Sequence, residues 1–205
     1  MEQTFKDFLL EKYENPQKYI DTLNRDCAPF LRDVGGMANI NEMCIRRPPL
    51  GVLRGMNTAT DTFLTKEVRA GRTPVDTSKE MHVLMDNWFN DKFGHRYRSN
   101  SIFASPRISQ ARAYGNVYMI FPIGEYKVCS SPKVRDLFNL TNVAADKGVF
   151  NYDDTYEEGV IKWLDVLGYK QGPVTEDVFH TKTEMMIACK SYHALNLNDW
   201  RKMIP

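Results

Sequence analysis

The sequence predicts an α+β protein in which helices come first and are followed by small sheets. Two observations support this class. The first part of the chain carries amphipathic helical patterns without strand patterns, and short strands mixed with helices follow, many of them expected to be antiparallel. In addition, no Gly-x-Gly-x-x-Gly or Gly-x-x-x-x-Gly-Lys-[Ser/Thr] motif follows a strand, which argues against a doubly wound nucleotide-binding fold.

The N-terminal region, residues 1–48, is expected to be a helical extension docked on an α+β domain of residues 49–205. A second helical pattern begins after Pro16, and Gly35-Gly36 is expected to end the region. In the first helical pattern, apolar side chains fall on one side: Phe5, Phe8 and Leu9.

The next segment, RRPPLGVLRGM, predicts a short apolar strand that ends on Arg54-Gly55. The polar stretch after it is turn-rich, with a helical turn expected near residues 62–68. SKEMHVLMDNWFNDKFG has apolar residues at helical spacing, and we expect Ser78 to cap this helix and Gly94 to end it.

Strand patterns return in SIFA, NVYMIFPI and EYKVCS, which we expect to supply the sheet. SPKVRDLFNL and DDTYEEGVIKWLDVLG predict helices, the second ended by Gly168, and YKQGPVTEDVFHTK predicts a loop. TEMMIACKSYHAL predicts a closing hairpin of strands 184–188 and 192–195, followed by a short C-terminal helix or tail.

Composition narrows the class of protein. The chain has 205 residues, 42% of them hydrophobic, which is enough for one substantial core. With 27 basic and 26 acidic residues the net charge is +1, which argues against general polyanion binding but leaves a local basic patch open. No long apolar run and no secretory signal pattern is present, so we expect a cytoplasmic protein without membrane contacts.

The cysteines and histidines predict neither a disulfide framework nor a metal site. The four cysteines, at positions 27, 44, 129 and 189, form no Cys-x-x-Cys pair. The four histidines form no His-x-x-x-His or His-Glu-x-x-His motif. We therefore expect reduced and mostly buried thiols.

Three places combine a short strand with a polar side chain at its end. Arg54 is followed by Gly55, and a guanidinium turned into a cleft suits phosphate because of its planar fork. Ser105 lies in a turn closed by Pro106, and Glu184 opens an apolar strand. Taken singly, each has an ordinary explanation as a surface arginine, a capping serine or a solvated edge carboxylate.

Taken in order, VLRGM, FASPRISQARAYG and TEMMIACKSYHAL resemble the Arg–Ser–Glu branch of the ADP-ribosyltransferase superfamily. The resemblance extends over residues 50–195 and implies an ADP-ribosyltransferase-like fold with split small sheets. Where the family has Ser-Thr-Ser, this chain has Ala104-Ser105-Pro106, so only Ser105 carries over. Lys182 stands where arginine-modifying members carry glutamate, which argues against arginine as the acceptor.

The resemblance implies NAD as the cofactor and assigns roles to four positions, with three aromatic residues as further candidates. Arg54, with Gly55, would hold a phosphate or the adjoining ribose, and Glu184 would bind the 2′-hydroxyl of the nicotinamide ribose. Ser105 would hydrogen-bond to Glu184 and orient it. Three aromatic side chains are candidates for stacking on the nicotinamide: Phe103, Tyr114 and Tyr97.

The implied activity is NAD-dependent transfer of ADP-ribose to a protein, a nucleic-acid base or water, with release of nicotinamide. VYMIFPIGEYKV is similar to segments of bacteriophage proteins, which would place the chain in a host cytoplasm. The main alternative is a non-catalytic binding protein, such as a phage accessory factor, acting on a host protein. A third interpretation is a nucleic-acid binder that uses Arg96 and Arg98 on either side of Tyr97.

Overall fold

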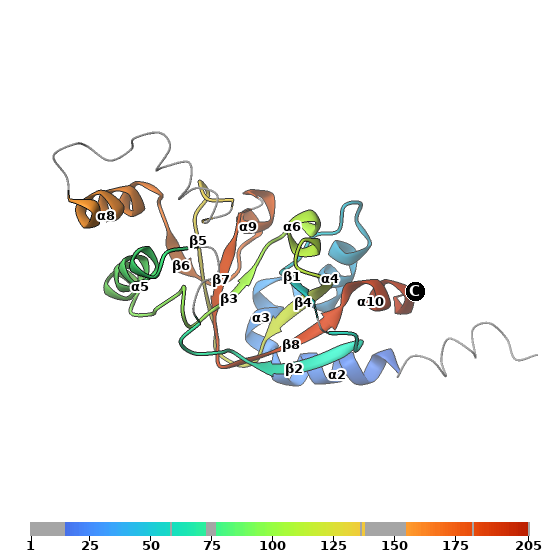
Figure 1. Ribbon diagram of the computed structural model, residues 1–205. Coiled ribbons are helices and arrows are strands. Elements are labelled where there is room, and N and C mark those ends of the chain that lie inside the picture. The colour runs from blue at the N-terminus through green and yellow to red at the C-terminus, as the bar shows by residue number, and fades with distance from the viewer. Residues whose placement is uncertain are drawn as a thin grey trace, which may run out of the picture.

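The α+β class is confirmed by a computed structural model that contains two small antiparallel sheets and flanking helices (Figure 1). The predictions for Phe5, Phe8 and Leu9, for Lys182, and for four of the ten residues of SPKVRDLFNL (136 and 138–140) fall outside the described residues. The structure describes residues 15–57, 59–72, 77–135, 137, 155–181 and 183–204.

Each sheet has four strands, and every pair of neighbouring strands in both sheets is antiparallel. The first sheet has, in spatial order, β1 (Leu53–Met56), β4 (Asn116–Pro122), β8 (Ser191–Asn196) and β2 (Phe63–Glu67). The second has β3 (Ile102–Ala104), β7 (Met185–Ala188), β5 (Lys127–Ser130) and β6 (Lys170–Gly172).

The predicted hairpin of residues 184–195 is wrong, because β7 and β8 belong to different sheets. β7 pairs with β3 and β5, whereas β8 pairs with β2 and β4. Both strands are almost entirely buried, and a strand buried on both faces is best accommodated inside a sheet with a neighbour on each side. The short turn at Cys189-Lys190 therefore carries the chain from one sheet to the other.

Three further local predictions are corrected by tertiary pairing. Residues 63–67 form strand β2 instead of a helical turn, because β8 offers them a complete antiparallel ladder. The predicted loop after Gly168 contains β6 and helix α9 (Glu176–Thr181). Arg54-Gly55 was expected at the end of the strand and instead lies in the middle of β1.

The N-terminal helices are α2 (Pro16–Asp26), α3 (Ala28–Asp33) and α4 (Gly36–Ile45). The side chain of Asn15 caps α2 by accepting a hydrogen bond from the backbone N–H of Gln17 at 2.9 Å. The expected end of the helical region at Gly35-Gly36 is wrong, because α4 starts at Gly36 after a left-handed turn at Gly35 (φ +79°).

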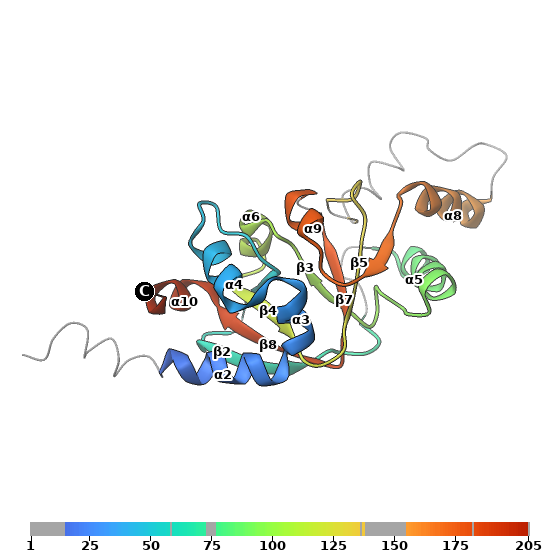
Figure 2. The same ribbon diagram turned by 180° about the vertical axis from the view of Figure 1, so that it is seen from behind.

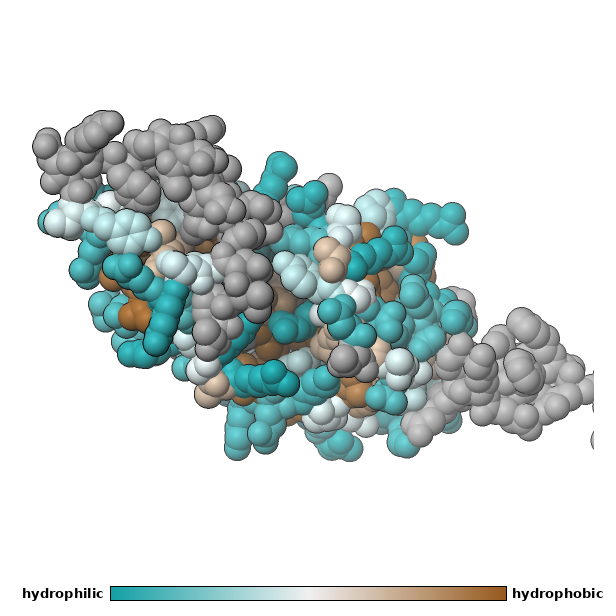
Figure 3. Space-filling view, in the orientation of Figure 1, coloured by the Kyte–Doolittle hydropathy of each residue, from teal (hydrophilic) through white to brown (hydrophobic). Residues whose placement is uncertain are grey.

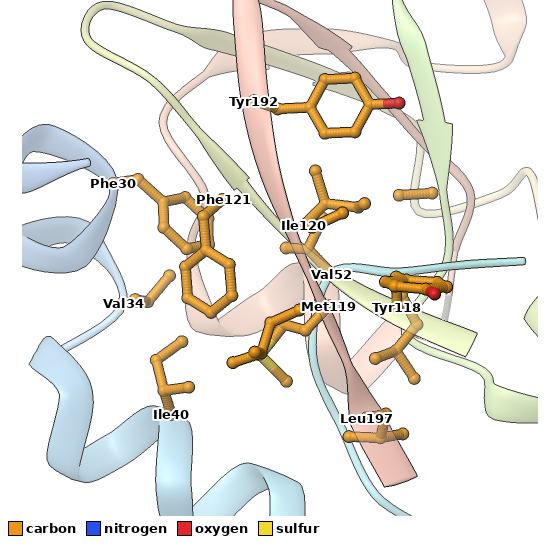
Figure 4. Packing of buried hydrophobic residues seen from close by; sticks show 14 of the residues in the cluster. Phe30, Val34, Ile40, Val52, Tyr118, Met119, Ile120, Phe121, Tyr192 and Leu197 are labelled. Carbon is orange, nitrogen blue, oxygen red and sulfur yellow. The ribbon is translucent and has the colours of Figure 1, made fainter. Parts of the chain in front are cut away.

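These helices cover one face of the first sheet (Figure 2). Figure 4 shows how they do so: Phe30, Val34 and Ile40 extend from the helices toward Met119 and Phe121 of β4. Phe30 meets the Phe121 ring edge to face, with centroids 5.7 Å apart. The helical layer and the sheet therefore share one hydrophobic core.

The second sheet separates two hydrophobic cores. Met185 and Ile187 of β7 face the core shared with the first sheet, and Met186 faces a second core. This is the alternation expected of a strand. The second core also takes in α5 (Lys79–Phe93) and α8 (Tyr156–Val166), which pack on each other beside the sheet.

Helix α5 is confirmed as predicted. The hydroxyl of Ser78 accepts a hydrogen bond from the backbone N–H of Met81 at 3.2 Å, and Gly94 ends the helix in the left-handed conformation (φ +71°). Helix α8 begins with a capping box between Thr155 and Glu158. The other helices of the described residues are α6 (Ile108–Arg112) and α10 (Leu197–Met203).

All four cysteines are free: Cys27, Cys44 and Cys129 are buried and Cys189 is half-buried. Burial raises the pKa of Cys27, Cys44 and Cys189 to about 12. The expectation that the thiols are mostly buried is confirmed. Among the described helices, none is both long and apolar enough to cross a membrane.

Candidate functional site

A cavity of about 280 Å³ opens where the edges of the two sheets approach each other. Figure 3 shows hydrophobic residues in a hollow near the middle of one face, in the region between the two sheets of Figure 1. Eleven of the described residues line the cavity: Leu53, Arg54, Gly55, Arg72, Phe103, Ala104, Ser105, Gln110, Ala111, Tyr114 and Glu184. Six of the seven candidate positions named from the sequence are among them, and the seventh, Tyr97, is not.

Strands β1 and β3 are joined at this cavity by a short backbone bridge. The N–H of Leu53 donates to the carbonyl oxygen of Ser105 at 3.1 Å, and the N–H of Ser105 donates to the carbonyl oxygen of Leu53 at 2.8 Å. The bridge fixes Arg54 beside the Ser105 turn, although 51 positions separate them in the chain.

The guanidinium of Arg54 is hydrogen-bonded to another residue that lines the cavity, Phe103. Its Nη1 donates to the carbonyl oxygen of Phe103 at 2.9 Å, across the junction of the two sheets. Burial lowers the pKa of Arg54, and the positive charges of Arg72 and Arg69 lower it further. Arginine nevertheless stays protonated, so a cation lies in a partly desolvated wall.

Gly55 has a packing role in this wall. A Cβ atom at position 55 would lie 1.9 Å from the carbonyl oxygen of Ala111 and 2.8 Å from the backbone of Tyr114. Glycine therefore allows α6 and the residues after it to lie directly on β1. This close approach brings Tyr114 to the rim, where its side chain is 59% exposed.

Ser105 is buried, and its hydrogen bonds differ from the expected one. Its hydroxyl donates to Oε1 of Gln110 at 2.8 Å and accepts from the backbone N–H of Arg107 at 3.1 Å. The predicted bond from Ser105 to Glu184 is thus not the bond that this hydroxyl makes. The hydroxyl orients Gln110, whose side chain also lines the cavity.

Glu184 lies just before β7 and reaches the cavity from the second sheet. Its Oε2 accepts a hydrogen bond from the backbone N–H of Leu137 at 3.2 Å, and its own N–H donates to the carbonyl oxygen of Val134 at 3.3 Å. Burial lowers the pKa of Arg98, and the negative charge of Glu184 acts in the opposite direction by raising it. Glu184 is the only carboxylate among the described residues lining the cavity.

The aromatic candidates divide into two groups. Phe103 and Tyr114 line the cavity, although the guanidinium of Arg72 lies 4.7 Å from the centroid of the Phe103 ring and covers part of it. Tyr97 is wrong as a stacking candidate, because it is fully buried in the second core and its hydroxyl accepts from Nε2 of Gln171 at 2.8 Å.

The basic pair flanking Tyr97 does not form one surface. Arg98 is buried, and its guanidinium donates to Oγ1 of Thr77 at 3.1 Å while its backbone N–H donates to Oδ1 of Asp86 at 2.9 Å. Only Arg96 of the pair is exposed. The predicted Arg-Tyr-Arg surface for nucleic acid is therefore wrong.

Two cavity residues, Arg72 and Gln110, were missed by sequence reasoning. Gln110 sits one helical turn beyond the Ser105 turn, so a helix starting near Ile108 would have indicated it. Arg72 has no such signal, because it follows a turn-rich stretch. Its backbone N–H donates to the carbonyl oxygen of Ser99 at 3.0 Å, a contact that only the tertiary structure creates.

The cavity brings together two guanidinium groups, one carboxylate, one amide and two aromatic rings. Such a set suits a ligand that has both an anionic part and a planar ring. Comparisons of the chain with protein-family models, with curated proteins and with solved structures find no match, so the case for a function rests on this cavity.

Proposed function

We propose that this chain binds NAD in the cavity between its two sheets and acts as an NAD-dependent ADP-ribosyltransferase. The single observation that carries the proposal is the convergence of Arg54, Ser105 and Glu184 on one cavity. These residues come from three motifs that are far apart in the sequence. The arrangement of two small antiparallel sheets beside each other supports an ADP-ribosyltransferase-like fold.

The proposed reaction breaks the bond between C1′ of the ribose and the nitrogen of nicotinamide. The bonding electrons leave with the nitrogen, so neutral nicotinamide departs and positive charge develops on the sugar. A nucleophile of the acceptor then bonds to C1′ and loses its proton to solvent. Glu184 would stabilise the developing charge, because a fixed carboxylate attracts it more strongly in the transition state than in the ground state.

The other residues would hold the substrate. Arg54 would bind a phosphate of NAD, and Tyr114 at the rim would offer its face to the nicotinamide. Ser105 would act as a positioning residue, because its hydroxyl donates a hydrogen bond to Oε1 of Gln110. The acceptor is a macromolecule or, if NAD is simply hydrolysed, water.

The decisive experiment measures nicotinamide release from NAD by the wild-type chain and by Glu184→Gln. Glutamine keeps an oxygen for the N–H of Leu137, so the local fold is retained while the charge is removed. We expect a loss on the order of 10²–10³ in rate, as for removal of a preorganised transition-state contact. Glu67→Gln, at an exposed position of β2, is the matched control and should leave the rate unchanged.

Absence of nicotinamide release by the wild-type chain, with or without candidate acceptors, would refute the enzymatic proposal. The alternative, a non-catalytic binding protein, would then be favoured. A thermal shift separates cofactor binding from its absence, since a ligand at about 100 times its dissociation constant adds ~2.7 kcal/mol to the stability of the folded state.

A further inference from the structure

Two positively charged side chains, Arg54 and Arg72, line the cavity that the carboxylate of Glu184 also lines. Arg54 lies deeper, half-buried, and Arg72 is exposed at the mouth. Within the part of the chain that the structure describes, neither guanidinium forms an ion pair. Both guanidinium groups line one cavity, and the positive charge of Arg72 contributes, after burial, to lowering the pKa of Arg54.

Both guanidinium groups are positioned by one residue, Phe103. The carbonyl oxygen of Phe103 accepts from Nη1 of Arg54 at 2.9 Å, and the ring of Phe103 lies 4.7 Å from the guanidinium carbon of Arg72. The loop that carries Arg72 is held to the same region, because the N–H of Gly71 donates to Oδ1 of Asn100 at 2.9 Å. Neither side chain is therefore free to turn away from the cavity without losing a contact.

Such an arrangement is unfavourable in the empty cavity, since like charges repel more strongly in a partly desolvated site than in water. A bound anion would attract both guanidinium groups, and this attraction would offset their mutual repulsion. Among the described residues, the guanidinium of Arg54 makes one hydrogen bond, to Phe103, which leaves most of its five N–H donors available. A guanidinium binds phosphate through two parallel hydrogen bonds. The two arginines together suit a ligand group with two negative charges.

We infer that Arg54 and Arg72 form a two-arginine site for the diphosphate group of the ligand, with Phe103 as the residue that positions both. Arg72 receives the group at the mouth, and Arg54 binds it inside. Phe103 then serves the diphosphate site instead of stacking on the nicotinamide. This inference rests on the proposed function for the identity of the ligand as NAD, while the anion site can be tested without it.

The test measures the affinity for inorganic pyrophosphate by calorimetry, at constant ionic strength so that general screening is equal. We expect Arg72→Ala and Arg54→Ala each to weaken binding by about 10-fold or more, as for loss of a charge-assisted hydrogen bond. The matched control is Arg112→Ala, which removes the same charge from an exposed position on α6. It should change the affinity by less than about 2-fold, because exposed charges are screened.

Two further variants test the geometry. Arg72→Lys keeps the charge but loses the planar fork, so it should recover only part of the lost affinity. Phe103→Leu removes the ring under Arg72 and keeps the carbonyl oxygen that holds Arg54. It should weaken pyrophosphate binding in the wild-type background and have little effect in an Arg72→Ala background.

The outcomes separate this inference from the proposed activity. Failure of the wild-type chain to bind pyrophosphate, or equal binding by Arg72→Ala and the wild type, would overturn the two-arginine site. Nicotinamide release that is lost in Glu184→Gln but unchanged in Arg72→Ala would also count against it, while leaving the proposed activity intact. Pyrophosphate and ADP-ribose binding that depends on Arg72, without any cleavage of NAD, would support the site and refute the activity.

Discussion

At Gly55 the lack of a side chain allows helix α6 to rest on strand β1, and this contact shapes one wall of the cavity. An added Cβ would come within 1.9 Å of the carbonyl oxygen of Ala111, which is a backbone atom that cannot rotate away. Gly55 therefore contributes to the shape of the cavity although it carries no polar group. Gln110 and Tyr114 line the cavity because α6 lies in this position on β1.

We predict that Gly55→Ala destabilises the protein by about 1–3 kcal/mol, the usual effect of overpacking a tight contact. It should also weaken binding of the ligand by moving α6 away from β1. Urea unfolding measures the first effect and calorimetry the second. Gly172→Ala is the control, because an added Cβ there meets nothing within 4 Å, and its stability should change by less than about 1 kcal/mol. Equal effects of the two substitutions would contradict the prediction.

At the scale of elements, helix α2 is tied to the first sheet through one carboxylate at its end. Oδ2 of Asp26 lies 3.0 Å from Nε2 of His193 on β8, and the other ring nitrogen of His193 lies 2.9 Å from Oγ1 of Thr65 on β2. The Arg25 guanidinium also donates to Asp26, at 2.7 Å. These hydrogen bonds, with that of Arg25 the largest cause, lower the pKa of Asp26 from 3.8 to about 2.

This shift predicts a defined pH dependence. Because the pKa of Asp26 is lower in the folded than in the unfolded state, its contribution to stability is present above pH 3.8 and is lost as the pH falls through about 2. Asp26→Asn should therefore be less stable than the wild type near neutral pH. The difference in unfolding free energy should shrink toward zero in the acid range, measured by urea unfolding at a series of pH values.

The control for this prediction is Asp91→Asn, an exposed carboxylate of α5. Near neutral pH it should change the free energy of unfolding by less than about 0.5 kcal/mol, as for an exposed substitution. If Asp26→Asn gave a constant difference over the pH series, the hydrogen bonds of Asp26 would contribute nothing that depends on its charge.

At the scale of the whole molecule, one core joins the N-terminal helices to both sheets. Phe30 of α3 is 1% exposed and contacts the rings of Phe121 and Tyr126, which belong to the first sheet and to the segment after it. Strand β7 contributes Met185 and Ile187 to the same core. Helices and sheets that share a core are expected to unfold together.

We predict that Phe30→Ala lowers the free energy of unfolding by about 3–5 kcal/mol and that the whole chain still unfolds in a single transition. Far-ultraviolet circular dichroism and tryptophan fluorescence should give the same midpoint. Val83→Ala, at an exposed position of α5, should change stability by less than about 0.5 kcal/mol. Separate transitions for helices and sheets would show that the N-terminal helices form an independent unit.

The sequence by itself determined those features that depend on local signals. Apolar spacing and capping residues identified α5 between Ser78 and Gly94, and the apolar runs identified β3, β4 and β5. The cavity residues Arg54, Ser105 and Glu184 were recognised because each adjoins a short apolar stretch of sequence. Such signals are contained within about one turn or one strand of chain.

Only the tertiary structure decided how these pieces pair and what the polar groups contact. The strands β7 and β8 look like a hairpin locally, but each is buried on both faces and gains two neighbours by joining a different sheet. Arg72 reaches the cavity, and Ser105 bonds to Gln110, through contacts set by the junction of the two sheets. The partners of a strand cannot be identified from the neighbouring sequence, because pairing between distant strands depends on how the whole core is buried.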